Sequence, residues 1–170
     1  LMTQSKVQFL LCYGHPDSRS KLVEANYPVV NLGKDTLLPV SAPATDGQAL
    51  YCIESTSVLP VLEYSDTSGL GRILKTTHRH LYSESAQAKS GNTISVVFTA
   101  PNAFLLKTMA LEGRGVAWLP KSLIAEELNS RKLMQAGSDA WQVQVNIRLY
   151  RQASDMSQVA EQIWKATQKS

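Results

Sequence analysis

Short apolar runs alternate along the chain with segments in which apolar residues recur at helical spacing. Val58–Tyr64 and Ile94–Thr99 are two such runs, and each predicts a β-strand. The segment after the first run predicts a helix, because a set of apolar positions keeps the spacing of one helical face: Leu70, Ile73, Leu74, Thr77 and Leu81. Each strand is therefore followed directly by a predicted helix.

The same alternation continues toward the C-terminus. Pro101 is expected in the first turn of a helix that runs to Leu111, and Gly113 is expected to end it. Val116–Leu119 predicts a strand, Leu123–Leu128 a helix, and Val143–Tyr150 another strand with alternating apolar residues. The last predicted helix carries Met156, Val159, Ala160, Ile163 and Trp164 on one face, with Asp155 and Gln158 spaced as a capping pair.

The N-terminal part of the chain contains two further predicted strands. Val7–Tyr13 is short and apolar, which favours a buried parallel strand, and Thr36–Val40 predicts the second strand. The segment 19–34 between them has a mixed, loop-like composition. Alternating strands and helices predict an α/β fold with largely parallel strands.

Composition and charge narrow the class of protein. The chain has 170 residues, 44% of them apolar, and a net charge of only +3. No apolar run approaches the length of a membrane span, and the first residues do not resemble a signal peptide, so a cytoplasmic protein without membrane contact is expected. The most basic segment, 72–80, is interpreted as a solvated helix face, with phosphate contact as the alternative.

The polar residues do not form a recognisable catalytic or metal-binding motif. The three histidines are His15, His78 and His80, and no nucleophile–base pattern accompanies them. Glu126 and Glu127 are interpreted as solvated charge on a surface helix. Cys12 and Cys52 are expected to be reduced thiols, with a redox pair as the alternative. The sequence therefore predicts a protein that is not an enzyme and needs no cofactor or metal.

A ligand site is better supported, because hydroxyl-rich segments follow two predicted strands. In α/β sheets ligands bind beyond the carboxyl ends of strands, where helix N-termini favour small anions. The alternative is that these hydroxyls only cap their helices. The candidate ligand-binding residues at these strand ends, including the end of the first strand, are Tyr13, His15, Ser65, Thr67, Ser68, Thr99 and Ala100.

Several segments, taken in order, resemble the effector-binding domain of LysR-type transcription regulators. Glu112–Pro120 is similar to that family's glycine-containing strand motif, and Leu37–Pro43 to its crossover strand. Tyr64-Ser65 and Thr99-Ala100 resemble the two junctions that face the effector in the family, and Arg148–Arg151 its return strand. The resemblance covers essentially the whole chain.

The resemblance implies two Rossmann-like lobes similar to type 2 periplasmic binding proteins, with the first lobe incomplete. Residues 1–41 and 143–170 would form lobe one, and residues 42–142 lobe two. A small polar or anionic effector would bind between the lobes and control DNA binding by a winged helix-turn-helix that this sequence lacks. The implied partners are the effector and further copies of the chain in a homodimer or tetramer, with contacts expected on segments 72–81 and 123–128.

Two other interpretations accompany this one. A solute-binding protein of a transporter shares the implied fold and is the alternative function. Within the family, the chain most resembles the branch with a hypochlorite-responsive regulator, whose switch uses methionines. Asn102 stands where one such methionine is expected, and Met109 is interpreted as a core residue. Methionine-based sensing is therefore not inferred.

Overall fold

The computed structural model describes residues 7–18, 27–79 and 93–168. The chain divides into two compact units, residues 1–34 with 145–170 and residues 35–144. Two long strands, β2 (Val29–Ser41) and β7 (Val143–Arg151), carry the chain from one unit to the other. Among the described residues, no helix is long and apolar enough to cross a membrane.

The first unit contains β1 (Phe9–Gly14), the adjoining parts of β2 and β7, and helix α6 (Gln158–Thr167). β1 pairs with β7 in antiparallel orientation, and β7 lies between β1 and β2. Trp164 of α6 stacks on Phe9 with ring centroids 6.4 Å apart, and the Arg151 guanidinium lies 5.7 Å from the centroid of the Trp164 ring. The bidentate pair of Arg151 with Glu161, at 2.6 and 2.8 Å, fixes α6 to the end of β7.

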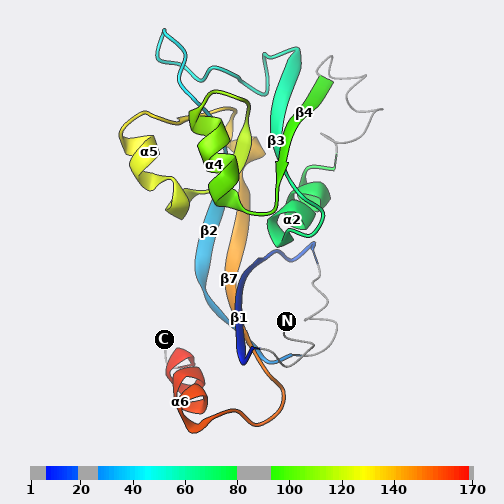
Figure 1. Ribbon diagram of the computed structural model, residues 1–170, viewed down its shortest axis with the longest axis vertical. Helices are drawn as coiled ribbons and strands as arrows, with labels where there is room; N and C mark the ends of the chain where they lie inside the picture. Colours follow the sequence, from blue (N-terminus) through cyan, green and yellow to red (C-terminus); the bar gives the residue numbers. More distant parts are fainter. Residues whose placement is uncertain (1–6, 19–26, 80–92, 169–170) are drawn as a thin grey trace. The chain divides into compact units, whose positions relative to one another are not determined.

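The second unit is built around two neighbouring parallel strands, β3 (Val58–Tyr64) and β4 (Thr93–Ala100) (Figure 1). β5 (Ala117–Pro120) is antiparallel to β2, and a parallel bridge joins Val61 to Val116 just before β5. The short strand β6 (Met134–Gln135) also pairs with β2. Parallel and antiparallel pairings are therefore mixed.

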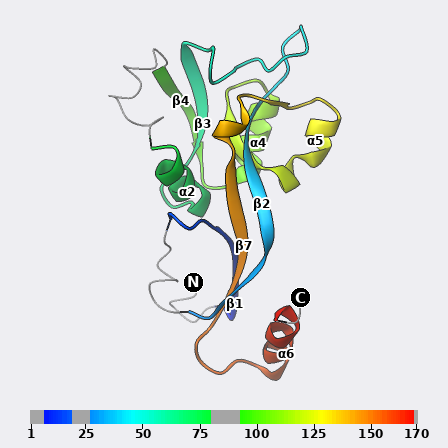
Figure 2. The same cartoon turned by 180° about the vertical axis from the view of Figure 1, so that it is seen from behind.

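Helices follow the strands of this unit. α2 (Gly69–Thr77) follows β3, and α4 (Ala103–Leu111) follows β4. After β5 come a 3₁₀ turn (Lys121–Leu123) and the short helix α5 (Ala125–Asn129), and a second 3₁₀ turn (Asp139–Trp141) precedes β7. Figure 2 shows the same arrangement from behind. α4 packs on β5 and β3, and its buried residues Leu106 and Ala110 join a core with Val61, Leu62 and Leu119.

The structure corrects the predicted strand arrangement. β1 is antiparallel and only partly buried, with Leu11 60% exposed, so the prediction of a buried parallel strand is wrong. An apolar run without alternation does not specify the direction of its partner. β2 begins at Val29, inside the segment predicted to be a loop, because pairing with β7 extends a strand whose polar residues face outward.

Helix ends differ from the prediction in several places, of which three are informative. α2 ends at Thr77, and Leu81 and His80 lie outside the described residues. Asn102 caps α4, so Pro101 precedes the helix and does not lie in its first turn. Ser157, and not Asp155, caps α6 by accepting a hydrogen bond from the Ala160 N–H. In the last two cases a residue with a short polar side chain stands closer to the helix than the predicted one.

Glu54 connects the loop after residue 50 to the second 3₁₀ turn. Its carboxylate accepts hydrogen bonds from the Ser138 N–H at 2.7 Å and the Trp141 Nε1 at 2.9 Å, and the Cys52 thiol lies 3.2 Å away. Burial opposes ionisation of Glu54, but the hydrogen bonds from Ser138 and Cys52 outweigh it and lower the pKa from 4.5 to about 2. The ionised carboxylate therefore holds two loops together.

A lowered carboxyl pKa in the folded state predicts a pH dependence of stability. The stabilisation by Glu54 is present above the unfolded pKa of 4.5 and is lost as the pH falls toward 2. Glu54→Gln should therefore make the urea midpoint depend less on pH between these values. An unchanged pH dependence in Glu54→Gln would contradict this role.

Candidate functional site

The carboxyl ends of β3 and β4 meet where each strand passes into its helix. Tyr64 ends β3, is buried, and donates its hydroxyl hydrogen bond to the Trp118 carbonyl at 3.0 Å. The next residue, Ser65, donates its backbone N–H to the Ala100 carbonyl at 2.9 Å. Strand pairing also places Thr99 opposite Glu63. The two hydroxyl-rich segments are therefore adjacent, and we call them the β3–α2 loop (Ser65–Ser68) and the β4–α4 loop (Thr99–Asn102).

Side-chain hydroxyls in the β3–α2 loop have two different roles. Ser68 is buried and caps α2, since its Oγ accepts a hydrogen bond from the Gly71 N–H at 3.4 Å. Ser65 Oγ and Thr67 Oγ1 lie 2.9 Å apart, with Ser65 half-buried and Thr67 exposed. The capping interpretation therefore describes Ser68, while Ser65 and Thr67 present hydroxyls beside the positive end of the α2 dipole.

A glycine lets α2 approach the end of β3 closely. A Cβ at Gly71 would lie 2.9 Å from the Tyr64 Cβ and 3.0 Å from the Ser65 carbonyl oxygen. These distances are too short for an ordinary side chain, so only glycine permits this packing. The N-terminal turn of α2 thus lies directly against the β3–α2 loop, where its first N–H groups have no partner within the helix.

The β4–α4 loop provides the second half of the arrangement. Thr99 is exposed, and Ala100 is buried by its pairing with the end of β3. Asn102 caps α4 by accepting a hydrogen bond from the Leu105 N–H at 3.1 Å. The sequence prediction missed this cap, although an Asn directly before an apolar helix is a recognisable signal. The structure therefore brings five of the predicted residues together: Ser65, Thr67, Ser68, Thr99 and Ala100.

The other two predicted residues, Tyr13 and His15, belong to the first unit. Tyr13 lies near the end of β1, opposite Ile147 of β7. His15 follows β1 and accepts a hydrogen bond at Nδ1 from the Asp17 N–H at 3.1 Å. Their participation in a ligand site remains a prediction.

Charged residues surround the β3–α2 loop, and the sequence prediction did not identify them. Lys75 of α2 donates to Asp66 at 2.6 Å and lies 3.6 Å from Glu63, while Arg72 donates to the Thr67 carbonyl at 3.3 Å. The hydrogen bond with Lys75 lowers the pKa of Asp66, and the same bond raises the pKa of Lys75. Asp66 and Lys75 are therefore both ionised at neutral pH. No sequence motif marks a pair nine residues apart.

Candidate metal ligands do not cluster in the part of the chain that the structure describes. No group of three or more His, Cys, Asp or Glu side chains there is placed to hold a metal ion. Cys12 and Cys52 are not joined in a disulfide. His78, the C-cap of α2, is buried with its Nε2 3.0 Å from the Trp141 carbonyl oxygen, in contact with the rings of Trp118 and Trp141.

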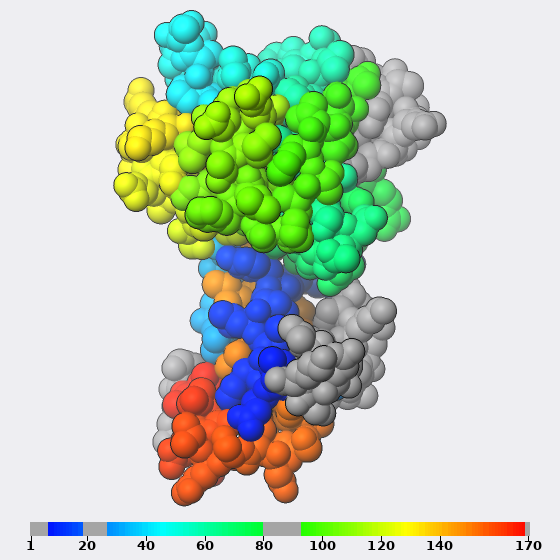
Figure 3. All heavy atoms as spheres, in the orientation of Figure 1, coloured from blue at the N-terminus to red at the C-terminus, as the bar shows by residue number. Residues whose placement is uncertain are grey.

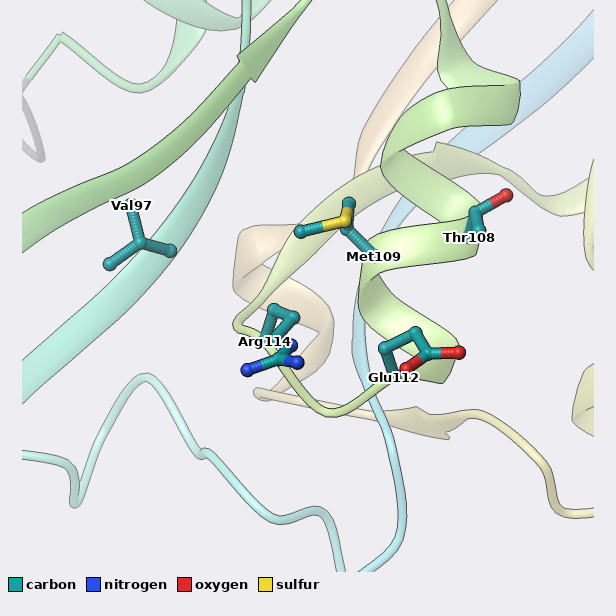
Figure 4. Close-up of a pocket in the computed structure, with 5 residues that line it drawn as sticks. All are labelled: Val97, Thr108, Met109, Glu112 and Arg114. Atoms are coloured by element: carbon teal, nitrogen blue, oxygen red, sulfur yellow. The ribbon is translucent and has the colours of Figure 1, made fainter.

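A shallow hollow of about 660 Å³ lies on the outer side of β4 and α4 (Figure 4). Met109 points toward Val97 there, with Arg114 next to it and Thr108 and Glu112 on the side of the helix away from Val97. Met109 is only half-buried, so the interpretation as a core residue is wrong. Phe104 and Leu111 of α4 are also exposed to solvent.

Comparison with known proteins agrees with the fold and with the sequence resemblance. The family model described as LysR substrate binding domain matches residues 6–170. The chain therefore belongs to the LysR substrate-binding domain family, which is a regulatory and not a catalytic family, and it has the type 2 periplasmic-binding-protein-like fold of LysR regulatory domains.

Two curated relatives and one solved structure illustrate the similarity. The HTH-type transcriptional regulator YjiE of Escherichia coli K12 is 33% identical over 145 residues, which cover 85% of this chain and 45% of YjiE. The HTH domain-truncated transcriptional regulator QseD of Escherichia coli O157:H7 is 32% identical over 145 residues, covering 85% and 56%. The chain thus spans about half the length of these relatives. The apo regulatory domain of HypT from Salmonella typhimurium has a TM-score of 0.79 at 27% identity, covering 99% of this chain and 74% of that one.

Proposed function

We propose that this chain is the effector-sensing domain of a cytoplasmic LysR-type transcription regulator. Family membership supports a regulatory role, and the relatives at 32–33% identity carry the names of transcriptional regulators. The observation that carries the proposal is the hydrogen bond from the Ser65 N–H to the Ala100 carbonyl, because it places two hydroxyl-bearing loops and two helix N-termini side by side. The family match does not favour the transporter alternative.

The effector proposed for this site is a small polar or anionic metabolite. Ser65, Thr67 and Thr99 offer hydroxyl groups, and the first turn of α2 offers N–H groups and the positive end of a helix dipole. Ser68 and Ala100 would shape the site by holding the two loops in place, and Tyr13 and His15 remain predicted contributors. Binding would shift the balance between conformations of the domain and thereby alter DNA binding by a winged helix-turn-helix in the rest of the protein.

Substitution of the two loop hydroxyls tests this function. Thr99→Val keeps the shape of the side chain, and Ser65→Ala removes one oxygen, so the fold should persist. A hydroxyl hydrogen bond contributes about 0.5–1.5 kcal/mol, so each variant should weaken binding by roughly two- to twelvefold. Calorimetry would use small carboxylates, inorganic phosphate and bromide as probes, the last because a HypT regulatory domain is described as bromide-bound. Ser130→Ala, at the C-terminal end of α5, is the control. Unchanged affinity in both Thr99→Val and Ser65→Ala would show that Ser65 and Thr99 do not bind the ligand.

We also propose that copies of the chain pair through the α4 surface, defined here as Phe104, Leu105, Leu111, Val96 and Val97. All five side chains are exposed, and Figure 3 shows α4 and β4 on one face of the second unit. The segments suggested by the sequence, 72–81 and 123–128, expose no large apolar side chain among their described residues. An apolar surface of this kind favours a protein partner.

Phe104→Ser should shift this self-association toward monomer in sedimentation velocity at micromolar concentration. The reason is that a side chain 66% exposed in the isolated chain would lose its buried contact in the dimer. Val159→Ser is the matched control, because Val159 is also 66% exposed but belongs to α6 of the first unit. Equal association of Phe104→Ser and the parent protein would exclude the α4 surface as the contact.

A further inference from the structure

Lys75 connects three segments around the proposed ligand site. It belongs to the last turn of α2, yet its ammonium group reaches back to Asp66 in the β3–α2 loop at 2.6 Å and to Glu63 near the end of β3 at 3.6 Å. Glu63 is paired across the sheet with Thr99. One side chain therefore bridges a helix, a loop and a strand that all adjoin the hydroxyl groups of the site.

Without Lys75, the carboxylates in this cluster would repel a bound anion. Glu63 and Asp66 carry two negative charges within a few residues of Ser65 and Thr67, where the proposed effector binds. The side chain of Glu63 is mostly shielded from solvent, so water screens its charge less than that of Asp66. Lys75 neutralises one of these two charges locally, and Arg72, bound to the Thr67 carbonyl, supplies the second positive charge.

The same contacts restrict the conformation of the loop. Three hydrogen bonds order it from the backbone side, namely Ser65 N–H to Ala100, Ser68 N–H to Ser65 and Gly71 N–H to the Ser68 hydroxyl. Asp66 and Thr67 lie between these anchors and are exposed, and the Asp66 side chain and the Thr67 carbonyl are held from α2. Lys75 holds the Asp66 side chain, and Arg72 holds the Thr67 carbonyl.

We propose that Lys75 is a positioning residue of the ligand site, which holds the β3–α2 loop in its binding conformation and offsets the charge of Glu63 and Asp66. The consequence for ligand affinity rests on the proposed function, whereas the ordering of the loop does not. The proposal assigns no ligand contact to Lys75 itself, because its ammonium group is already engaged by two carboxylates.

Hydrogen exchange of the ligand-free chain tests the ordering of the loop. In Lys75→Met, which keeps most of the aliphatic stem, exchange at the Ser65–Ser68 amides should rise about two- to fivefold, the range that a partly exposed ion pair supports. Lys75→Arg should restore the slow exchange. Arg79→Met is the matched control, because it removes a cation just past the end of the same helix. The urea midpoint should change little in all three variants.

Salt distinguishes a charge effect from a packing effect. Near 1 M salt the Debye length is about 3 Å, so the difference between Lys75→Met and the parent protein should shrink. Exchange that is unchanged in Lys75→Met, or raised equally in Arg79→Met, would overturn the proposal. Exchange that rises along the entire chain would also overturn it, because it would show a general loss of stability.

Anion binding tests the charge effect separately. Lys75→Met should weaken binding of phosphate or a small carboxylate, and Lys75→Arg should not. Equal affinity in the parent protein and Lys75→Met would refute the charge role. If the parent protein binds none of the probes while its loop still loosens in Lys75→Met, the ordering role is supported and the proposed function fails.

Discussion

Leu106→Ala is expected to lower the free energy of unfolding by about 2–5 kcal/mol, the range for truncation of a fully buried leucine. Leu106 has no exposed surface and belongs to the face of α4 that packs on β3 and β5. Removing three side-chain carbons there leaves a cavity between the helix and the strands β3 and β5. Urea unfolding followed by circular dichroism measures the change.

Leu105→Ala is the control for this prediction. Leu105 is the preceding residue and has the same chemistry, but it is 43% exposed on a neighbouring, solvent-facing side of α4. Truncation of Leu105 should lower the free energy of unfolding by well under half as much as truncation of Leu106. Equal losses in the two variants would show that α4 does not pack in the orientation described.

Gly115→Ala is expected to destabilise the second unit by about 1–3 kcal/mol, as overpacking of a close-packed interior does. An added Cβ would lie 2.7 Å from the Pro60 carbonyl oxygen, which accepts a hydrogen bond from the Val116 N–H at 2.8 Å. The obstacle is backbone, so a rotamer change cannot relieve the clash. The chain must move β3 away from the segment leading into β5.

The comparison for Gly115 is Gly33→Ala in β2. An added Cβ at Gly33 meets no atom within 4 Å, so that variant should be as stable as the parent protein or slightly more so. Thermal unfolding of the two variants separates a steric effect from the general effect of replacing a glycine. A stable Gly115→Ala variant would contradict the close contact between Gly115 and Pro60.

The sequence predicted the strands of the second unit well, because their local signals and their tertiary environment agree. Val58–Tyr64 is both an apolar run and a fully formed strand, and Gly113 has the positive φ of 69° that a helix-ending glycine supplies. In the first unit the local sequence signals and the tertiary environment disagree. Strand direction at Phe9–Gly14 depends on its partner β7, which lies more than 130 residues away, and no local pattern specifies it.

The candidate site shows the same division. Hydroxyl groups directly after predicted strands identified Ser65 and Thr99, since strand ends and helix caps are local features. Lys75, Glu63 and Asp66 could not be connected from the sequence, because their contact depends on how α2 lies against β3. That packing depends in turn on the absence of a side chain at Gly71.

The central claim is that a small anionic or polar molecule binds where β3 and β4 end. Hydrogen exchange of the chain with and without a probe that binds in calorimetry tests it most directly. We expect slower exchange at the β3–α2 loop and the β4–α4 loop, with no change at the hollow lined by Val97, Met109 and Arg114. Protection confined to that hollow, or absent from both loops at saturating probe, would contradict it.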